Sequence, residues 1–356
     1  MPNQPSHALL VAAAVLSAAA LAETTPKHHR LSATPESVQW GWLDPKEPPK
    51  LTIDSGDIVS VETLMHARDQ IQKGTTMEKI VELRKANPGG GPHSITGPIY
   101  VKGAKPGDVL EIRIRKIVPK RTGTNFNLPG KEFPTIGALA SQFPEGHVQY
   151  FDIDPKKPTV EFKPGIAIPL RPFPGVLAVG IDPEDPSPRK GGSKEPLAPV
   201  STLRPWKNGS NMDINELTAG STIFIPVFLE GGLIWTGDSH CAQGNGEVNL
   251  TAMECSFQEI ELQPIVRKDL KLTWPRIETK THWIQVGFDE DLGKAMTIAV
   301  GETVDFLTSK GLTREEAYSL TALAADCRVS QVVDIRKGVH CMVPKSLWVG
   351  KAISAR

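Results

Sequence analysis

The chain has 356 residues, of which 39% are hydrophobic and 22% charged, with four Cys; this composition excludes a disordered tail and a small disulfide-stapled domain. Lys plus Arg and Asp plus Glu both number 40, so the formal net charge is zero, which excludes the basic footprint of a general nucleic-acid binder. The 31 Gly and 31 Pro favour short strands joined by turns, and we expect a mainly β protein.

The first predicted element is a secretory signal peptide over residues 1–22. An uncharged run covers residues 8–22 and ends in Ala20-Leu21-Ala22, the pattern of a signal cleavage site. It is shorter than the ~20 residues of a membrane-spanning helix. No Lys or Arg precedes it, so the alternatives are a misassigned start or a frayed N-terminal helix. We expect an exported protein, periplasmic or secreted, with no membrane contact after cleavage.

Short β-rich runs fill the chain from residue 32 to residue 264. They cover residues 51–53, 58–64, 99–101, 109–117, 221–228 and 247–262. Gly, Pro and Asp separate them, which predicts a β-sandwich or jelly-roll-like core over residues 23–270. One helix is expected here, within residues 71–87. The proline-rich residues 182–205 predict a long surface loop that covers a site.

The last segment, residues 271–356, is expected to form a smaller α+β subdomain packed on the core. Thr313 and Glu316 have the spacing of a capping box, and apolar residues at helical spacing follow them. This pattern predicts a helix of about 12 residues that ends near Asp326. Two strand-like runs then follow, at residues 329–334 and 339–343.

Three residues near the end of the core have the chemistry of a hydrolytic site. Asp238 and His240 are two positions apart, so an extended strand would place both on one face, where they could bind one cation. Glycines at 244 and 246 would let the chain double back and bring Glu247 to the same pocket as general base. The alternative is a solvated hairpin with ordinary turn residues.

Further candidates for this pocket come from other segments. Asp213 offers another carboxylate ligand, although it could instead cap a helical turn. We expect His93, Asn211 and Gln243 to contact the substrate, with Asn211 or His93 donating to an oxyanion. The alternative for His93 is an ordinary loop histidine. The other histidines, His66 among them, receive no role.

The four cysteines show neither the density of a disulfide scaffold nor a C-x-x-C motif. Export would permit disulfides, and Cys327–Cys341 is the local candidate; the alternative is four small buried hydrophobic side chains. Cys241 is a poor candidate nucleophile, because neighbours on a strand point to opposite faces and His240 could not activate it.

Several motifs, in order over residues 40–344, resemble the acetamidase/formamidase family of amide hydrolases. They lie at residues 55–57, 97–101, 106–110, 169–175, 211–221, 237–252 and 337–340. The resemblance implies an all-β sandwich core with a smaller mixed appendage, and hydrolysis of short amides to ammonia and a carboxylate, with zinc or calcium in some relatives. The chain departs from the family pattern at Ser239, Cys241 and Asn245, where the family tends to have Gly, Ala and Asp.

These observations lead to the hypothesis of metal-assisted amide hydrolysis. Asp213, Asp238 and His240 would bind a divalent cation, Zn²⁺ rather than Ca²⁺ because one ligand is a nitrogen, and Glu247 would serve as the base. The alternative is an exported, non-catalytic β-sandwich that binds a small ligand on the same scaffold. The expected partners are a small amide and copies of this chain, as a homodimer or larger homo-oligomer, with no nucleic acid.

Overall fold

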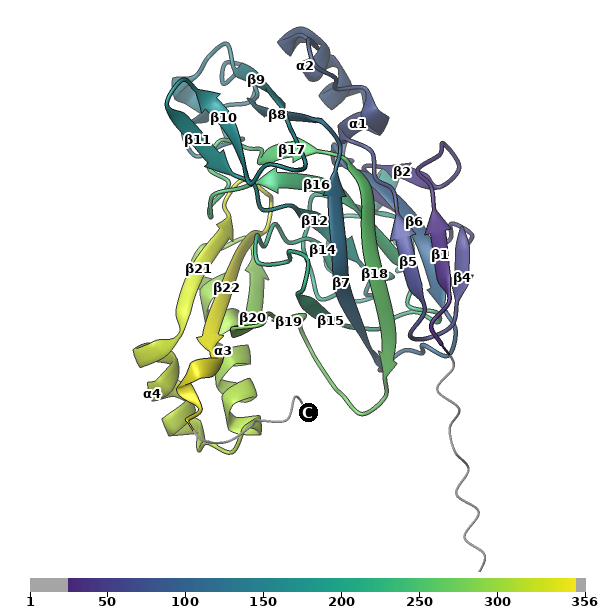
Figure 1. The fold of residues 1–356 in the computed structure, drawn as a ribbon, viewed down its shortest axis with the longest axis vertical. Helices are drawn as coiled ribbons and strands as arrows, with labels where there is room; N and C mark the ends of the chain where they lie inside the picture. Colours follow the sequence, from purple (N-terminus) through teal and green to yellow (C-terminus); the bar gives the residue numbers. More distant parts are fainter. Residues whose placement is uncertain (1–24, 350–356) are drawn as a thin grey trace, which may run out of the picture.

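The computed structural model describes residues 25–349, which form a mainly β protein with two nine-stranded sheets, as the composition predicts (Figure 1). The expected signal peptide over residues 1–22 lies outside the described residues. Within residues 25–349, no helix has both the length and the apolar character that a membrane crossing requires.

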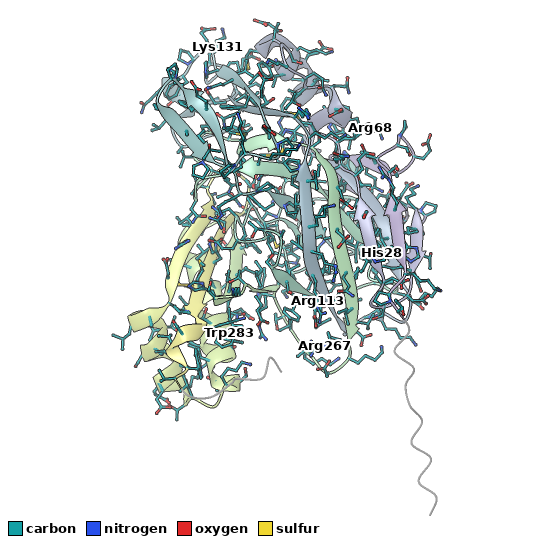
Figure 2. All side chains as sticks on the ribbon, in the orientation of Figure 1. His28, Arg68, Arg113, Lys131, Arg267 and Trp283 are labelled. Carbon is teal, nitrogen blue, oxygen red and sulfur yellow. A yellow bond between two sulfur atoms is a disulfide. The ribbon has the colours of Figure 1, made fainter. Side chains whose placement is uncertain are left out.

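The first sheet is built around a long antiparallel strand pair, β7 and β18. Its order is β1 (His28–Leu31), β5 (Ile58–Val61), β18 (Phe257–Arg267), β7 (Val109–Pro119), β15 (Thr222–Pro226), β19 (Arg276–Glu278), β20 (His282–Asp289), β22 (Lys337–Pro344) and β21 (Asp326–Gln331). Figure 2 shows Arg113 on β7 and Arg267 on β18, and both side chains pair with Glu111. The C-terminal strands therefore extend the same sheet as the core strands.

The second sheet carries the residues of interest. Its order is β14 (Gly209–Asn211), β12 (Phe173–Ala178), β16 (Ile234–Ala242), β17 (Met253–Cys255), β8 (Thr122–Asn127) and β9 (His147–Asp152). β6 (Ser94–Val101) also pairs with β16, and β2 (Val38–Trp40) and β4 (Leu51–Ile53) pair with β6. Two small pairs complete the strands: β10 (Thr159–Lys163) with β11 (Ile166–Pro169), and β3 (Trp42–Leu43) with β13 (Val200–Ser201).

One apolar core joins the two sheets. It contains Ile112 of β7 and Leu262 of β18 from the first sheet, and Phe173 of β12 and Ile234 of β16 from the second. All nine residues of β16 are buried, because this strand has the core on one side and side chains of loops and helices on the other. Polar side chains on β16 are therefore held in fixed positions away from bulk water.

Helices cover two ends of the molecule. The short α1 (His66–Asp69) and α2 (Met77–Ala86) lie over one end of the second sheet, and α3 (Leu292–Ser309) and α4 (Arg314–Ala324) accompany β20 to β22. Three single turns of 3₁₀ helix lie at Ala140–Gln142, Lys190–Gly192 and Lys345–Leu347. The predicted capping box at Thr313 and Glu316 is present and begins α4.

The longest helix, α3, has no counterpart among the predicted elements. Its sequence contains two glycines and several β-branched residues, which lower the intrinsic helix propensity. Ala295, Ala299 and Thr303 nevertheless recur every four residues on the buried face. The helix can approach the sheet closely, because a Cβ at Gly287 of β20 would lie 2.6 Å from the backbone nitrogen of Ala299.

Other boundaries differ from the predicted ones. The strand expected over residues 247–262 begins only at Met253, because residues 247–250 form a loop in which Glu247 and Leu250 have positive φ. The helix expected within 71–87 begins at Met77, where the Thr76 side chain caps it. The first C-terminal strand covers residues 326–331 instead of 329–334, and the division of the chain at residue 270 stays a prediction.

All four cysteines form disulfides. Cys327–Cys341 joins β21 to β22, which confirms the local candidate, and Cys241–Cys255 joins β16 to β17. The alternative of four unpaired buried side chains is wrong. Cys241 has no free thiol, in agreement with its exclusion as a nucleophile.

Candidate active site

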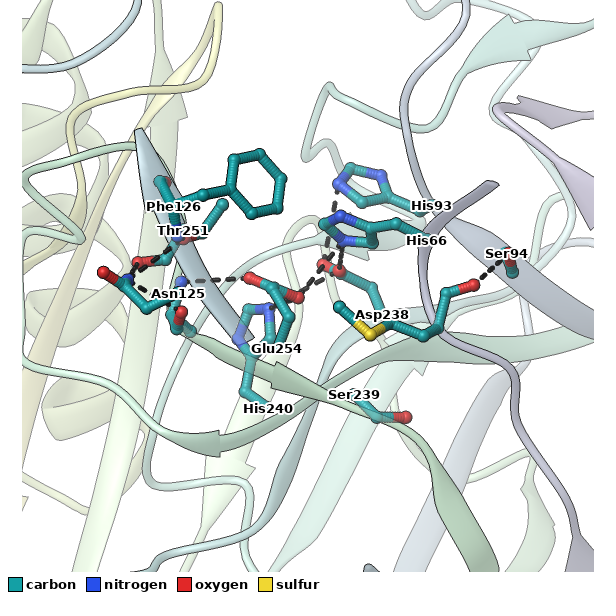
Figure 3. A network of polar contacts seen from close by, with 12 residues as sticks. His66, His93, Ser94, Asn125, Phe126, Asp238, Ser239, His240, Thr251 and Glu254 are labelled. Atoms are coloured by element: carbon teal, nitrogen blue, oxygen red, sulfur yellow. Dashed lines mark hydrogen bonds and ion pairs between the residues drawn. The ribbon is translucent and has the colours of Figure 1, made fainter. Parts of the chain in front are cut away.

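Eight acidic and imidazole side chains meet in a buried cavity between the second sheet and helices α1 and α2, and Figure 3 shows five of them: His66, His93, Asp238, His240 and Glu254. They are Asp213, Asp238, Glu247, Glu254, Asp334, His66, His93 and His240. The cavity has a volume of about 60 Å³, which is room for roughly four water molecules at about 15 Å³ each. Apolar side chains such as Trp40, Ile80 and Leu83 form the rest of its wall.

Strand β16 supplies two of these groups, Asp238 and His240, as the spacing predicts. Asp238 has a φ of 48°, so the strand is not regular at this position, yet both side chains reach the same cavity. The register of β12 and β16 places Gly175 opposite Asp238. A Cβ at Gly175 would lie 2.6 Å from Asp238 Oδ2 and 2.7 Å from Asp213 Oδ1. Glycine at 175 therefore leaves room between the two carboxylates.

Backbone strain is concentrated at this cavity. Non-glycine residues rarely adopt positive φ, at a cost of about 1–3 kcal/mol each. Among the described residues nine do so, and eight of these line the cavity or lie within two residues of a lining residue. Asp213, Asp238 and Glu247 are three of the eight, with φ of 51°, 48° and 45°. Such concentration is typical of a functional site.

The orientation of His240 is set by Gln243. Both amide donors of Gln243 are engaged, because Nε2 donates to the carbonyl oxygens of Asp213, at 2.9 Å, and Ser330, at 3.3 Å. Its Oε1 therefore accepts from Nδ1–H of His240, at 2.9 Å. His240 Nε2 then carries no proton when the ring is neutral, and it lies 3.5 Å from Asp238 Oδ1 and 3.3 Å from Glu254 Oε2.

His66 and Glu254 complete this side of the cavity. His66 Nε2 lies 2.9 Å from Asp238 Oδ1 and 3.1 Å from Glu254 Oε2. Glu254 is the cross-strand partner of His240 in the β16–β17 ladder, and its Oε1 accepts from the Ala252 backbone nitrogen. Figure 3 shows His66, Asp238, His240 and Glu254 pointing toward one another.

The opposite side of the cavity is poor in hydrogen-bond donors. Asp213 accepts from no amide, hydroxyl or imidazole of the described residues; its hydrogen-bonding neighbour is the Asp334 carboxyl group, and His240 Nδ1 is 3.8 Å away. Asn211 Nδ2 donates to Asp334 Oδ2 at 2.7 Å, while Asn211 Oδ1 has no partner. Buried carboxylates without donors are costly for a folded protein.

Burial and ion pairing act against each other at the imidazoles. Burial disfavours a charged His66, but Glu254 and Asp238 outweigh it and raise the pKa of His66 to about 9. The same carboxylates outweigh burial at His240 and raise its pKa well above the ordinary value. Burial lowers the pKa of His93 to about 4, although Asp238 attracts its charged form. His93 is therefore neutral at neutral pH.

The five carboxylates fall into two groups. Burial opposes the ionisation of all five, but the neighbouring imidazoles hold the pKa of Asp238 well below its usual range and lower that of Glu254 to about 2. Burial raises the pKa of Asp213 to about 7. Burial and the Asp213 carboxylate together raise the pKa values of Glu247 and Asp334 well above the ordinary range. A positive charge placed nearby would favour the ionised forms of these three carboxyl groups.

The side chains fit a divalent cation. Three groups of described residues offer ligand atoms that lie within 4.8 Å of one another: His66, His93 and Asp238; Asp213, His240 and Glu247; and Asp238, His240 and Glu254. Imidazole and carboxylate are the ligands expected of zinc sites. The Asp213 carboxylate, which accepts from no amide, hydroxyl or imidazole of the described residues, and the space left by Gly175 agree with such an ion.

The structure brings most of the predicted site residues together. Asp213, Asp238, His240, Glu247, His93 and Asn211 all line the cavity. Gln243 does not line it and instead lies behind His240. His93 Nδ1 is 2.9 Å from the Thr202 hydroxyl, and Leu203 lines the cavity, so the end of the proline-rich loop does reach the site.

Three residues at the cavity were absent from the predicted set. Glu254 could have been found, because it is an isolated charge within an apolar run of the sequence. That run, β17, pairs with β16, which carries the candidates Asp238 and His240. His66 had no such signal, since it precedes a left-handed turn at residues 67–69 that no local pattern indicates. Asp334 lies in the turn between β21 and β22, where acids are ordinary.

Comparison with known proteins gives one family. The acetamidase/formamidase family model matches residues 28–196 and 193–349. The acetamidase of Mycolicibacterium smegmatis is 28% identical over 266 residues, which are 63% of this chain and 64% of that protein. The chain thus matches less than two thirds of that relative's length.

Solved structures extend the similarity over nearly the whole chain. The crystal structure of an acetamidase from Bacillus halodurans has a TM-score of 0.77 at 28% identity, and the match covers 89% of this chain and 98% of that one. An acetamidase from Yersinia enterocolitica has a TM-score of 0.78 at 25% identity, covering 92% and 94% of the two chains.

Proposed function

The chain belongs to the acetamidase/formamidase family, and on that premise we propose that it hydrolyses the carbon–nitrogen bond of a linear amide to a carboxylic acid and ammonia. The observation that carries the proposal is the excess of buried acid: five carboxylates and three imidazoles share one cavity. Such an arrangement has little structural benefit without a cation, and it suits hydrolysis by an activated water.

We propose that Asp238, His240 and Glu254 hold a divalent cation, with His66 beside them. Gln243 supports this role because it fixes the proton on His240 Nδ1 and leaves Nε2 as the ligand atom, a common outer-shell arrangement. The nitrogen ligand favours Zn²⁺ over Ca²⁺. When bound, the cation would supply Lewis acidity toward a water and the amide carbonyl. The predicted ligand role of Asp213, on the Nδ1 side of His240, stays a prediction.

Glu247 is the proposed base. Burial and the nearby Asp213 raise the pKa of Glu247 well above the ordinary value, and an upward shift makes a carboxylate a stronger base. No hydrogen bond joins its side chain to another described residue, so the carboxylate is free to turn. It would take a proton from the attacking water and deliver it to the nitrogen, which must leave as an amine.

The oxyanion donor is proposed to be His93, with Asn211 as the second candidate. A neutral His93 that accepts from the Thr202 hydroxyl at Nδ1 carries its proton on Nε2. That nitrogen lies 3.7 Å from Asp238 Oδ2, on the cavity side. Loss of one oxyanion donor typically costs about 3 kcal/mol in the transition state.

The two disulfides are typical of proteins outside the reducing cytoplasm. We therefore propose that the protein is exported, in agreement with the signal peptide predicted over residues 1–22. Assembly as a homodimer or larger homo-oligomer stays a prediction.

Ammonia release from formamide and acetamide tests the proposal. Glu247→Gln should lower kcat about 100-fold or more, while the exposed Glu315→Gln on α4 should leave it unchanged. Wild-type turnover by Glu247→Gln would remove Glu247 as the base. Full activity after exhaustive chelation, with metal analysis confirming removal, would exclude the cation. Ligand-dependent thermal stabilisation without product would support the binding-protein alternative.

A further inference from the structure

An apolar groove lies on the far side of Glu247 from the cavity. Its volume is about 520 Å³, and one wall is the β10–β11 hairpin. Its larger apolar lining residues are Phe151, Phe162, Ile168, Pro169, Val248 and Met253, and four amide side chains, Asn125, Gln243, Asn245 and Asn249, also line it. Arg171 and Glu247 are the charged members among the described lining residues.

Two side chains separate the groove from the cavity, because Glu247 and Thr251 line both spaces. Thr251 is fixed: its hydroxyl donates to the Phe126 carbonyl oxygen and accepts from the Phe126 backbone nitrogen, both at 2.9 Å. Glu247 has no side-chain hydrogen bond to another described residue. Rotation of one unfixed carboxylate side chain would therefore connect the two spaces.

The sizes of the two spaces decide what each can hold. The cavity of about 60 Å³ has room for an amide head group, whereas the groove of about 520 Å³ is within the 300–1,000 Å³ typical of ligand pockets. A substrate as small as formamide would leave the groove empty. The proposed reaction alone therefore gives the groove no role.

Apolar side chains in the lining of the groove are exposed to water, which is unfavourable in free energy. Val248 is 59% exposed and Phe162 is 37% exposed, and the Phe162 ring stacks on the buried Phe151. Large apolar side chains that gather around a concave surface mark a binding surface. Because Glu247 and Thr251 line both spaces, a molecule in the groove would lie directly beside a group bound in the cavity.

We propose that this groove binds an apolar arm of the substrate, so that the preferred substrates are amides with several carbons or a ring beyond the reacting group. The inference rests on the proposed amide hydrolysis and specifies its substrate class. It does not depend on which side of the carbonyl carries the arm: an arm on the acyl side leaves ammonia as the second product, and an arm on the nitrogen leaves an alkylamine.

The test measures kcat/KM along two series: primary amides from acetamide to hexanamide, and acetamides with N-alkyl groups of increasing length. A buried methylene is worth about a two- to fourfold gain, so at least one series should rise about 20-fold or more across four methylenes, mainly through KM. The series that rises identifies the side of the carbonyl. If kcat/KM stayed constant with chain length in both series while acetamide was still cleaved, the groove would not bind a substrate arm. The proposed amidase reaction would be unaffected by that result.

Variants assign any rise to the groove. Phe162→Ser should reduce the hexanamide-to-acetamide ratio, or its N-alkyl counterpart, to within about threefold of unity. The matched control is Leu323→Ser on α4, an exposed leucine remote from the groove, which should keep the wild-type ratio. An unchanged ratio in Phe162→Ser would overturn the proposal.

A binding measurement separates the groove from the reaction. Absence of turnover with every amide would overturn the proposed function. Thermal stabilisation by bound amides would then test separately whether the groove binds an apolar arm. Hexanamide or N-butylacetamide should stabilise the wild type more than acetamide does, and Phe162→Ser should abolish the difference. Equal stabilisation by short and long amides would contradict binding of an apolar arm in the groove.

Discussion

Two buried clusters of acids and histidines lie in different parts of the molecule, and they differ in whether an arginine pairs directly with a carboxylate. In the hairpin cluster, Glu216 lies 3.1 Å from both Arg328 NH1 and His340 Nε2, and His340 Nδ1 lies 2.7 Å from the Ser330 hydroxyl. At the candidate active-site cavity, Asp213 shares a hydrogen bond with the Asp334 carboxyl group, and the nearest imidazole nitrogen, His240 Nδ1, is 3.8 Å away. An arginine thus pairs directly with the hairpin carboxylate, whereas no Lys or Arg among the described residues forms an ion pair with Asp213.

The comparison shows that buried acids and histidines can either support the fold or line a candidate site. Ser330, His340 and Glu216 have the composition of a nucleophile, base and acid, but all three are buried and none lines the described cavities. The Ser330 carbonyl accepts from the Gly246 backbone nitrogen at 2.9 Å, so the hairpin cluster supports the loop that carries Glu247. A carboxylate paired with an arginine therefore indicates support, whereas a buried carboxylate without such a pair is a candidate binding group.

The largest expected difference is at Asp213. Asp213→Asn should lower kcat/KM more than about 100-fold, beyond the loss typical of outer-shell partners, because the variant removes a cavity carboxylate. The metal-free variant should be as stable as the wild type or more so, since a neutral amide is less costly to bury than a carboxylate and can still accept from the Asp334 carboxyl group. Amide turnover and urea unfolding of chelated protein measure both effects. A large loss of stability would mean that the carboxylate is a structural group.

Gly175→Ala tests the space between the carboxylates. The added Cβ would press on Asp238 and Asp213, and we expect about a 100-fold loss of kcat/KM together with weaker metal binding. Gly338→Ala, in the hairpin, is the matched control, because its Cβ would meet its neighbours at 3.2 Å or more. Equal metal affinity in Gly175→Ala and the wild type, by titration, would contradict a cation between these groups.

The two disulfides sharpen the comparison, because each joins cysteines 14 residues apart. Equal loops predict equal stabilisation, about 3 kcal/mol in the chain-entropy model. Cys241 and Cys255 directly follow His240 and Glu254, in a ladder with a bulge at the site, whereas Cys327 and Cys341 lie in a longer hairpin ladder.

Replacement of each disulfide by a pair of serines should therefore affect function differently. The variant lacking Cys241–Cys255 should lose about 10- to 100-fold in kcat/KM, as outer-shell changes do, and the variant lacking Cys327–Cys341 should retain most of it. Both should unfold at lower urea concentrations. Equal activity losses in the two variants would contradict a positioning role for the first bridge.

The smallest effect on activity is expected at Glu216. Glu216→Gln should keep kcat/KM within about threefold of the wild type and lower the free energy of unfolding by about 2 kcal/mol at pH 7, reduced from a fully buried pair because Arg328 is partly exposed.

The stability difference should depend on pH. Burial opposes the charge of Glu216, but His340, Arg171 and Arg328 outweigh burial and hold the pKa of Glu216 below its ordinary value. The folded value is thus below the unfolded value of about 4.3, so the ionised group stabilises fully above that pH and loses this effect as pH falls through the folded value. Urea unfolding of both proteins from pH 7 to pH 3 should show the difference shrinking. A constant difference would contradict the ion pair.

The sequence pattern predicted the structure correctly where the feature depends on a few consecutive residues. The capping box at Thr313 and Glu316 needs only four consecutive positions, and α4 begins there. Asp238 and His240 were found because two positions on one strand share a face. Gln243 was predicted to contact substrate, but its amide groups are engaged with His240, Asp213 and Ser330, which the chain order does not reveal.

The sequence by itself determined the mainly β class, the helix at residues 314–324, and Asp213, Asp238, His240 and Glu247 as candidates, because these depend on spacing within short segments. Only the tertiary structure decided that His66, Glu254 and Asp334 join them, that Gly175 leaves the space between two carboxylates, and which cysteines pair. These features arise from strand register and left-handed turns that bring distant segments together, and such contacts leave no periodic trace along the chain.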